Sequence, residues 1–180
     1  MTVDPERVYV VGHSNGGMLT HRIGAQASQS IAAIAPMAAA IGGRAGPDAP
    51  EWQIATPRTP LSVIIFHGLK DDKIPYSGGP VGGEPGSREY KSVSEAVEFW
   101  TAHNRCRDSG WRQTRFDRAV EITTWQDCAG ETEVQLHTFK DVGHHWPAIS
   151  KANSRGPQES YNTAEVIWNF FKKFSNTPSS

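Results

Sequence analysis

The chain has 180 residues, of which 37% are hydrophobic, and a formal net charge of -1. This length is enough for one domain with its own core, and we expect a single α/β domain over residues 1–175 with a polar tail at 176–180. The near-neutral charge gives no basic surface for nucleic acid, and no apolar run approaches the roughly 18 residues of a membrane helix. The first residues lack the charged and apolar regions of a signal peptide. We therefore expect no nucleic acid and no membrane as a partner.

The first predicted element is a short buried strand over residues 7–11, because these residues are β-branched or aromatic and are bounded by turn residues. A G-x-S-x-G turn at residues 12–16 follows, and a small-residue helix begins at Gly16. A sharp strand-to-helix turn holds its serine, here Ser14, in a strained conformation with the hydroxyl exposed, and the flanking glycines permit it. The helix N-terminus offers unpaired N–H groups to an oxyanion, and we expect the N–H of Asn15 to be one. The alternative is a glycine-rich loop with a solvated serine.

Three further strands are predicted, which makes four parallel strands in all. Residues 61–66 are apolar nearly throughout, as in a strand that is covered on both faces. Residues 31–35 form a short buried strand, although their alanines favour helices, and residues 133–139 alternate strictly, as in a strand with one polar face.

Two helices and two loops complete the predicted elements. A helix begins at Ser92 with a capping box to Glu95 and buries Val93, Ala96, Val97 and Trp100. The last helix begins at Asn162 and buries Ala164, Ile167, Trp168, Phe171 and Phe174. Residues 42–60 and 78–86 are rich in glycine and proline and are predicted to be irregular. Trp52, in the first of these loops, either faces a substrate or anchors the loop.

Two cysteines, Cys106 and Cys128, flank a polar segment at residues 107–127 that is predicted to be poor in strands. A disulfide between them would stabilise the fold by about 3 kcal/mol on the chain-entropy model and would indicate an oxidising compartment. The alternative is two unlinked thiols.

A serine, an acid and a histidine each follow a predicted parallel strand directly, in the chain order of α/β-hydrolases. A serine hydroxyl becomes a good nucleophile when an imidazole takes its proton, and a carboxylate must orient that imidazole. We assign Ser14 as the nucleophile, Asp71 as the orienting acid and His144 as the general base. Asp72 and His145 are the neighbours that could replace the last two.

The remaining histidines have less specific interpretations. His13 is predicted to form part of the pocket wall, whereas His67 and His137 are predicted to be a strand-end and a surface histidine. A zinc site built from them is a weak alternative, because the chain has no HExxH motif. We predict that His13, His145 and Trp146 contact the substrate.

The motifs resemble those of the polyhydroxybutyrate depolymerase and feruloyl esterase group of α/β-hydrolases. The similarity spans most of the chain and covers residues 3–18, His67-Gly68 with Asp71, Pro75-Tyr76, Phe99-Trp100 with Asn104 and Cys106, Cys128, and residues 143–147. The resemblance implies that Asp71 and His144, and not their neighbours, fill the acid and histidine positions. It also implies that Cys106 and Cys128 are bridged and that the protein is secreted. His145 stands where members of the group more often have threonine, which would alter the pocket rim.

The resemblance also implies several strands before the serine turn, including a loop that supplies one oxyanion-hole N–H. Without them, the strand at residues 7–11 would be a bare apolar edge, which soluble proteins avoid. We therefore expect a further N-terminal segment or a second chain to cover this edge, so that the chain forms the C-terminal part of an α/β-hydrolase. Of the oxyanion-hole donors, only the N–H of Asn15 is predictable.

The expected activity is hydrolysis of carboxylic esters through an acyl-serine intermediate, with no metal or organic cofactor. The resemblance implies feruloyl or acetyl esters of plant polysaccharide, or polyhydroxyalkanoate, as substrates. One alternative is a serine peptidase of the prolyl-oligopeptidase type, which shares the serine turn and the residue order. The other is a non-catalytic fragment that lacks a complete oxyanion hole.

Overall fold

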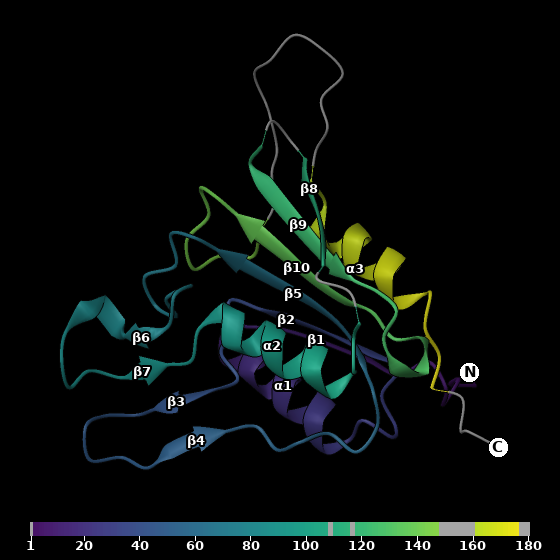
Figure 1. Cartoon of the computed structure of the whole chain (residues 1–180), viewed down its shortest axis with the longest axis horizontal. Helices are drawn as coiled ribbons and strands as arrows, with labels where there is room; N and C mark the ends of the chain where they lie inside the picture. Colours follow the sequence, from purple (N-terminus) through teal and green to yellow (C-terminus); the bar gives the residue numbers. More distant parts are fainter. Residues whose placement is uncertain (1, 108–109, 116–117, 148–160, 177–180) are drawn as a thin grey trace, which may run out of the picture.

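The computed structural model describes residues 2–107, 110–115, 118–147 and 161–176. Its centre is a six-stranded sheet (Figure 1), whose strands in spatial order are β1 (Tyr9–His13), β2 (Ala33–Met37), β5 (Ser62–Gly68), β10 (Val134–Phe139), β9 (Val120–Trp125) and β8 (Trp111–Arg115). The first four of these strands are parallel to one another, β9 runs antiparallel to β10, and β8 runs antiparallel to β9. All four predicted parallel strands are present, with β2 beginning two residues after the predicted start at Ile31. The chain is therefore an α/β protein with a largely parallel sheet.

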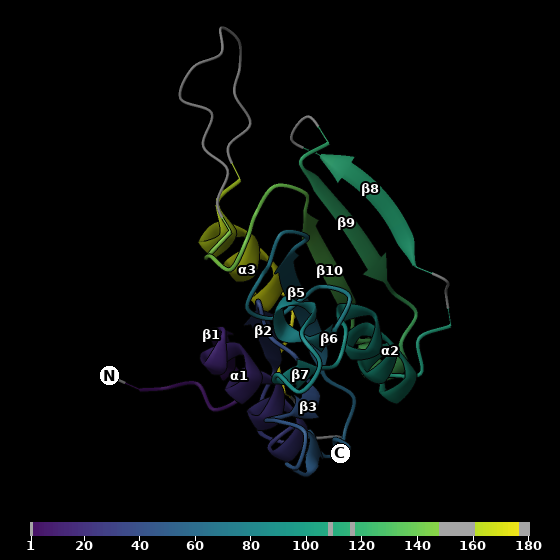
Figure 2. The same ribbon diagram turned by 90° about the vertical axis from the view of Figure 1, so that its left-hand side faces the viewer.

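The sheet is covered on both faces, as Figure 2 shows. Helices α1 (Asn15–Gln26) and α2 (Val93–His103) pack on one face and α3 (Thr163–Phe171) packs on the other. Strand β5 alternates between the two: Val63 and Ile65 pack against the first face, and Ile64 and Phe66 against the second. Its continuous apolar run follows from this double burial.

The prediction that the segment between the cysteines is poor in strands is wrong. It contains β8 and β9, and β9 pairs with β10 along its whole length. Val120 and Ile122 of β9 are buried in the core beside α3. The segment has few apolar residues, but these two alternate toward one covered face and that is enough for a strand near a sheet edge.

The predicted starts of α2 and α3 are confirmed, and the prediction of which residues are buried is partly wrong for α3. Ser92 and Glu95 form a reciprocal capping box at the start of α2, and the Asn162 side chain accepts from the Glu165 N–H at the start of α3. The predicted stripe of α2 is buried. On α3, however, Ala164 is exposed and Trp168 is 58% exposed. The residues that face the sheet are Thr163, Ile167, Phe170 and Phe171.

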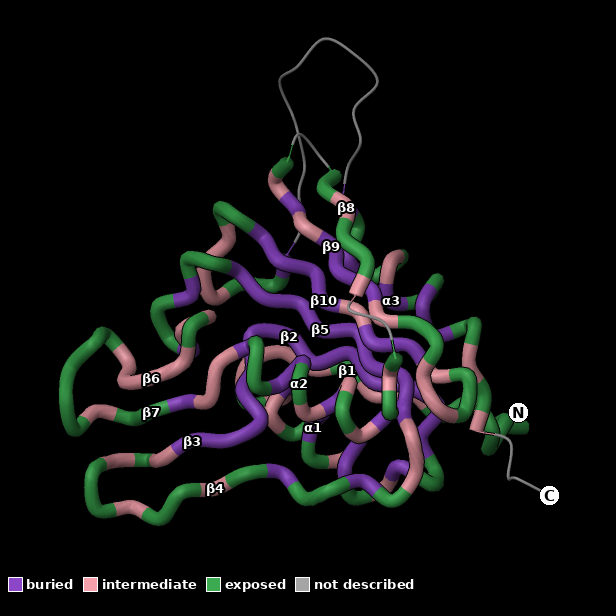
Figure 3. Tube along the Cα trace, viewed as in Figure 1, coloured by how far each residue is buried: buried purple, intermediate pink, exposed green. Residues whose placement is uncertain are grey.

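A second, smaller sheet lies beyond the carboxyl ends of the parallel strands, at the left of Figure 1. Its strands in spatial order are β4 (Glu51–Gln53), β3 (Gly42–Arg44), β7 (Glu89–Tyr90) and β6 (Gly79–Pro80), and short 3-10 turns occur at Val81–Gly83 and Ala129–Glu131. The prediction that residues 42–60 and 78–86 are irregular is therefore wrong in part. Figure 3 shows that β3 is mostly buried whereas β4 is mostly exposed.

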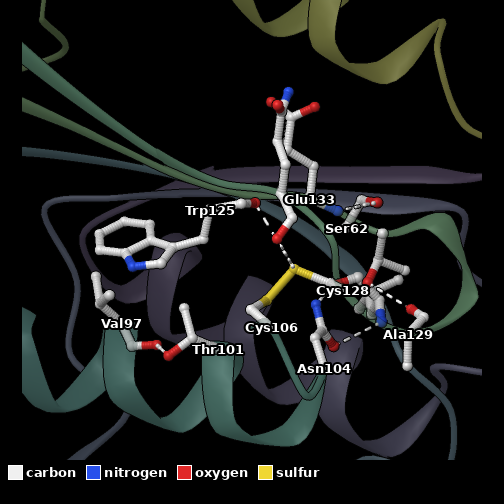
Figure 4. The surroundings of a disulfide bond; sticks show 12 residues. Ser62, Val97, Thr101, Asn104, Cys106, Trp125, Cys128, Ala129 and Glu133 are labelled. Carbon is white, nitrogen blue, oxygen red and sulfur yellow. Dashed lines mark hydrogen bonds between the residues drawn. A yellow bond between two sulfur atoms is a disulfide. The ribbon is translucent and has the colours of Figure 1, made fainter. Parts of the chain in front are cut away.

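A disulfide joins Cys106, just after α2, to Cys128, just after β9 (Figure 4). This confirms the bridge. Beside it, the Asn104 side chain accepts from the Leu61 N–H and donates to the Leu61 carbonyl. The disulfide lies at the amino end of the parallel strands, because Cys128 comes just after Trp125, and Trp125 pairs with Val134, the first residue of β10.

Strand β1 forms one edge of the main sheet in the described part of the chain. Val11 on this strand is 46% exposed. The expectation that another segment or chain covers this edge stays a prediction. No helix among the described residues is long and apolar enough to cross a bilayer. The expected tail at residues 176–180 falls outside the described residues, except for Asn176.

Candidate active site

Ser14 lies in the turn between β1 and α1, with its N–H donating to the Met37 carbonyl at 2.9 Å. Its φ of 58° lies in the left-handed region, which costs a non-glycine residue backbone strain. A Cβ at Gly12 would overlap the Gly16 carbonyl, so the tight turn requires glycine at that position. A Cβ at Gly16 would meet open space, and that glycine is not needed for room.

Asp71 follows β5 and its side chain is fully buried. One carboxylate oxygen, Oδ1, accepts hydrogen bonds from the backbone N–H groups of Lys73 and Ile74, both at 2.9 Å. Burial alone would raise the pKa of Asp71. Hydrogen bonds from His67, Ile74, His144 and Lys73 outweigh burial and hold the pKa well below its ordinary value. Asp71 is therefore a fixed negative charge.

His144 lies between the acid and the serine. Its Nδ1 donates to the Asp71 carboxylate at 2.9 Å, and its Nε2 lies 2.8 Å from the Ser14 Oγ. Because the carboxylate can only accept, Nδ1 carries the proton and Nε2 is free to accept the serine proton. The structure thus brings the three predicted residues into one continuous hydrogen-bond chain across sequence separations of 130 and 73 residues.

The two neighbouring alternatives point elsewhere. Asp72 is exposed and pairs with Lys73 at 3.2 Å. His145 is exposed as well. Among the described residues, the hydrogen-bond chain that reaches Ser14 contains Asp71 and His144 and neither of these two neighbours.

Of the other predicted site residues, His13 contacts this hydrogen-bond chain, and Asn15 and Trp146 lie close to its members in the sequence. The half-buried His13 ring lies 4.9 Å from the His144 ring, and burial together with the nearby His144 lowers the pKa of His13. Asn15 is the first residue of α1, where backbone N–H groups have no partner inside the helix. Trp146 is 47% exposed, two residues after His144. Contact of His13, His145 and Trp146 with a substrate stays a prediction.

His67 lies at the end of β5, as predicted for a strand-end histidine, whereas His137 differs from its predicted surface position. His67 is a buried residue whose Nε2 lies 3.4 Å from Asp71 Oδ2, so it belongs to the surroundings of the acid. Its position four residues before Asp71, at the end of a buried strand, is the signal that could have identified it. His137 is buried, not on the surface: Tyr161 Oη donates to its Nδ1 at 2.7 Å. Among the described residues, no group of three or more His, Cys, Asp or Glu side chains is arranged to hold a metal ion.

The fold and the site together define an α/β protein with a Ser–His–Asp hydrogen-bond chain at the carboxyl edge of its parallel strands. No protein-family model matches the chain. It is 25% identical over 176 residues to feruloyl esterase B of Piromyces equi, covering 96% of this chain and 28% of that protein. It is 27% identical over 162 residues to the putative esterase NocK of Nocardia uniformis subsp. tsuyamanensis, covering 81% of this chain and 44% of that protein. The chain thus spans less than half of either relative, and both similarities point toward esterases.

Proposed function

We propose that the chain carries the catalytic residues of a serine esterase with an α/β-hydrolase fold. The observation that carries this proposal is the continuous hydrogen-bond chain from the Ser14 Oγ through His144 to the buried Asp71. Each of its members has the required chemistry: a nucleophile in a strained turn, a free Nε2 for the base and a buried acid whose pKa is lowered. The names of the two relatives support an ester as the substrate.

In the proposed reaction, Ser14 Oγ attacks the ester carbonyl carbon while His144 Nε2 takes the hydroxyl proton. The carbonyl oxygen becomes an oxyanion, which the Asn15 N–H at the start of α1 stabilises. His144 then donates its proton to the leaving alcohol, and the acyl-serine forms. Water, activated by the same imidazole, attacks this intermediate and releases the acid and the free serine. Asp71 stays ionised and stabilises the His144 imidazolium during both formation and hydrolysis of the acyl-serine.

For the substrate, we propose feruloyl or acetyl esters of plant polysaccharide, or polyhydroxyalkanoate. The name of feruloyl esterase B supports feruloyl esters among these. The disulfide between Cys106 and Cys128 supports an extracellular location, since such bonds persist in oxidising compartments.

The proposed chemistry is tested with a fluorophosphonate, which labels activated serines covalently. We expect one adduct per chain on Ser14, as located by mass spectrometry, and no adduct in Ser14→Ala. Ser77→Ala, which removes a serine in the turn after Tyr76, is the matched control and should label fully. Absence of labelling in the unaltered chain would favour the non-catalytic alternative.

Substrate class is tested with p-nitrophenyl acetate, methyl ferulate and short hydroxybutyrate oligomers, with a prolyl p-nitroanilide as the peptidase probe. We expect turnover of at least one ester and none of the anilide. Cleavage of the anilide at a rate comparable to the esters would support the peptidase alternative instead.

A further inference from the structure

His67 is a fully buried imidazole that the catalytic scheme leaves without a task. It lies on β5, four residues before Asp71, and its Nε2 lies 2.9 Å from the Ile74 carbonyl. A carbonyl oxygen can only accept, so the His67 proton lies on Nε2. The same N–H faces Asp71 Oδ2 at 3.4 Å. In this tautomer, the His67 Nε2–H is a hydrogen-bond donor that faces the turn after β5, which contains Asp71.

Two hydrogen bonds to Ile74 hold the turn between Asp71 and Ile74. Within the turn, the Ile74 N–H donates to Asp71 Oδ1 at 2.9 Å. On strand β5, the His67 Nε2–H donates to the carbonyl of the same Ile74. His67 thus restrains the residue whose own N–H orients one carboxylate oxygen, and it also faces the other oxygen directly.

We infer that His67 is a positioning residue for Asp71: its Nε2–H keeps the carboxylate plane aligned with the Nδ1 of His144. This inference rests on the proposed function and extends it by one residue. Without the donor, the turn and carboxylate can rotate in a site where small misplacements are costly to catalysis. The polar contacts of the His67 Nε2–H are with Asp71 and with the turn that follows it, so we assign His67 a role that acts through the acid.

The ring is itself held in place by packing. Tyr76 meets it edge to face, with ring centroids 5.8 Å apart. Its Nδ1 is buried without a hydrogen-bond partner among the described residues. The titratable groups around the His67, Asp71 and His144 unit are His13, His21, Tyr76 and His145.

The test compares two variants of the full chain. His67→Phe keeps the ring and its packing but removes the donor, whereas in His67→Gln the side-chain amide can place an N–H near the position of Nε2. We expect His67→Phe to lower kcat by about tenfold with little change in KM, and His67→Gln to recover most of the loss. His103→Phe is the matched control, because His103 Nε2 also faces a backbone carbonyl, that of Thr59 at 3.1 Å, on the far end of α2. Its kcat should not change.

A second readout does not depend on turnover. Proton NMR follows the far-downfield resonance of the His144 Nδ1–H, which reports its hydrogen bond to the Asp71 carboxylate. In His67→Phe we expect this resonance to weaken or shift upfield, since the carboxylate is no longer held in line with Nδ1, while His67→Gln and His103→Phe keep it. An unchanged resonance in folded His67→Phe would overturn the inference. Failure of the proposed function would instead appear as an unaltered chain with no ester turnover and an intact resonance.

Discussion

Gly68 lies so close to Val142 that a Cβ at Gly68 would overlap the Val142 carbonyl group. This contact lets the loop after β10 cross the end of β5, where the Lys70 N–H donates to the Val142 carbonyl at 3.1 Å. His144 follows two residues later, above Asp71. The loop that carries His144 can approach Asp71 this closely because residue 68 is a glycine.

Gly68→Ala should displace the loop that carries His144. Overpacking of this kind costs about 1–3 kcal/mol, and the displacement should lower kcat by at least tenfold because His144 moves away from Ser14. Urea unfolding and ester kinetics measure the two effects. Gly46→Ala is the control, since a Cβ there meets open space. Full activity in Gly68→Ala would show that the loop can shift without cost.

Asp71→Asn should lower kcat by roughly 10³–10⁴-fold, because an amide can stabilise the wrong tautomer of His144 and carries no charge for the imidazolium. Asp72→Asn should leave kcat unchanged, since the Asp72 side chain is exposed and pairs only with Lys73 in the described structure. Steady-state ester hydrolysis measures both variants. Equal losses would mean that the two acids share the role that we assign to Asp71.

Stability should fall with acidification well before the carboxylates titrate. Burial lowers the pKa of His21 and of His137 to about 3, from an ordinary value of 6.5. At a pH between the folded and the unfolded pKa, each of these histidines is protonated in the unfolded chain and neutral in the folded chain. Each therefore lowers the unfolding free energy by about 1.4 kcal/mol for every pH unit of acidification. The lowered pKa of His13 acts in the same direction.

Urea unfolding between about pH 7 and about pH 5 measures this dependence. His137→Gln should remove a large part of the slope, but less than half, because His21 and His13 supply the rest. Asp71, whose pKa is depressed, stabilises the fold above its ordinary value of 3.8 and loses that effect only at lower pH, outside this window. A slope that is the same in His137→Gln would show that His137 does not titrate on unfolding.

Replacing both Cys106 and Cys128 with serine should lower the unfolding free energy by about 3 kcal/mol, the value for a loop of this size. The kcat of the folded double variant should not change, because the bridge lies at the amino end of the parallel strands and Ser14 lies at the carboxyl end. Denaturant titration with and without reductant, together with ester kinetics, separates the two effects. A large loss of kcat in the folded variant would contradict this separation.

Local patterns were sufficient for the parallel strands and for both capped helices. The strand at β5 was evident because a fully covered strand is apolar at every position, and the start of α2 because Ser92 and Glu95 are three residues apart. The G-x-S-x-G turn likewise identified Ser14, since strand, glycine and helix are adjacent in the chain.

Strands β8 and β9 were not predictable in the same way. Their residues are mostly polar, and pairing with β10 rather than their own hydrophobicity places them in the sheet. The exposure of Trp168 is unpredictable for a related reason: the spacing of apolar residues on a helix does not show how many of them the sheet covers.

The sequence by itself determined the residue types, their order and the strand ends at which they stand. It favoured Asp71 and kept the neighbouring Asp72 as an alternative, and for His67 it predicted only a place at a strand end. Which of these side chains meet depends on the tertiary structure, because burial and hydrogen bonding are set by neighbours far away in the chain: Asp71 is buried against His67 and His144, whereas Asp72 is exposed beside Lys73. The alignment of the three side chains depends on contacts such as that between Gly68 and Val142, which no local pattern contains.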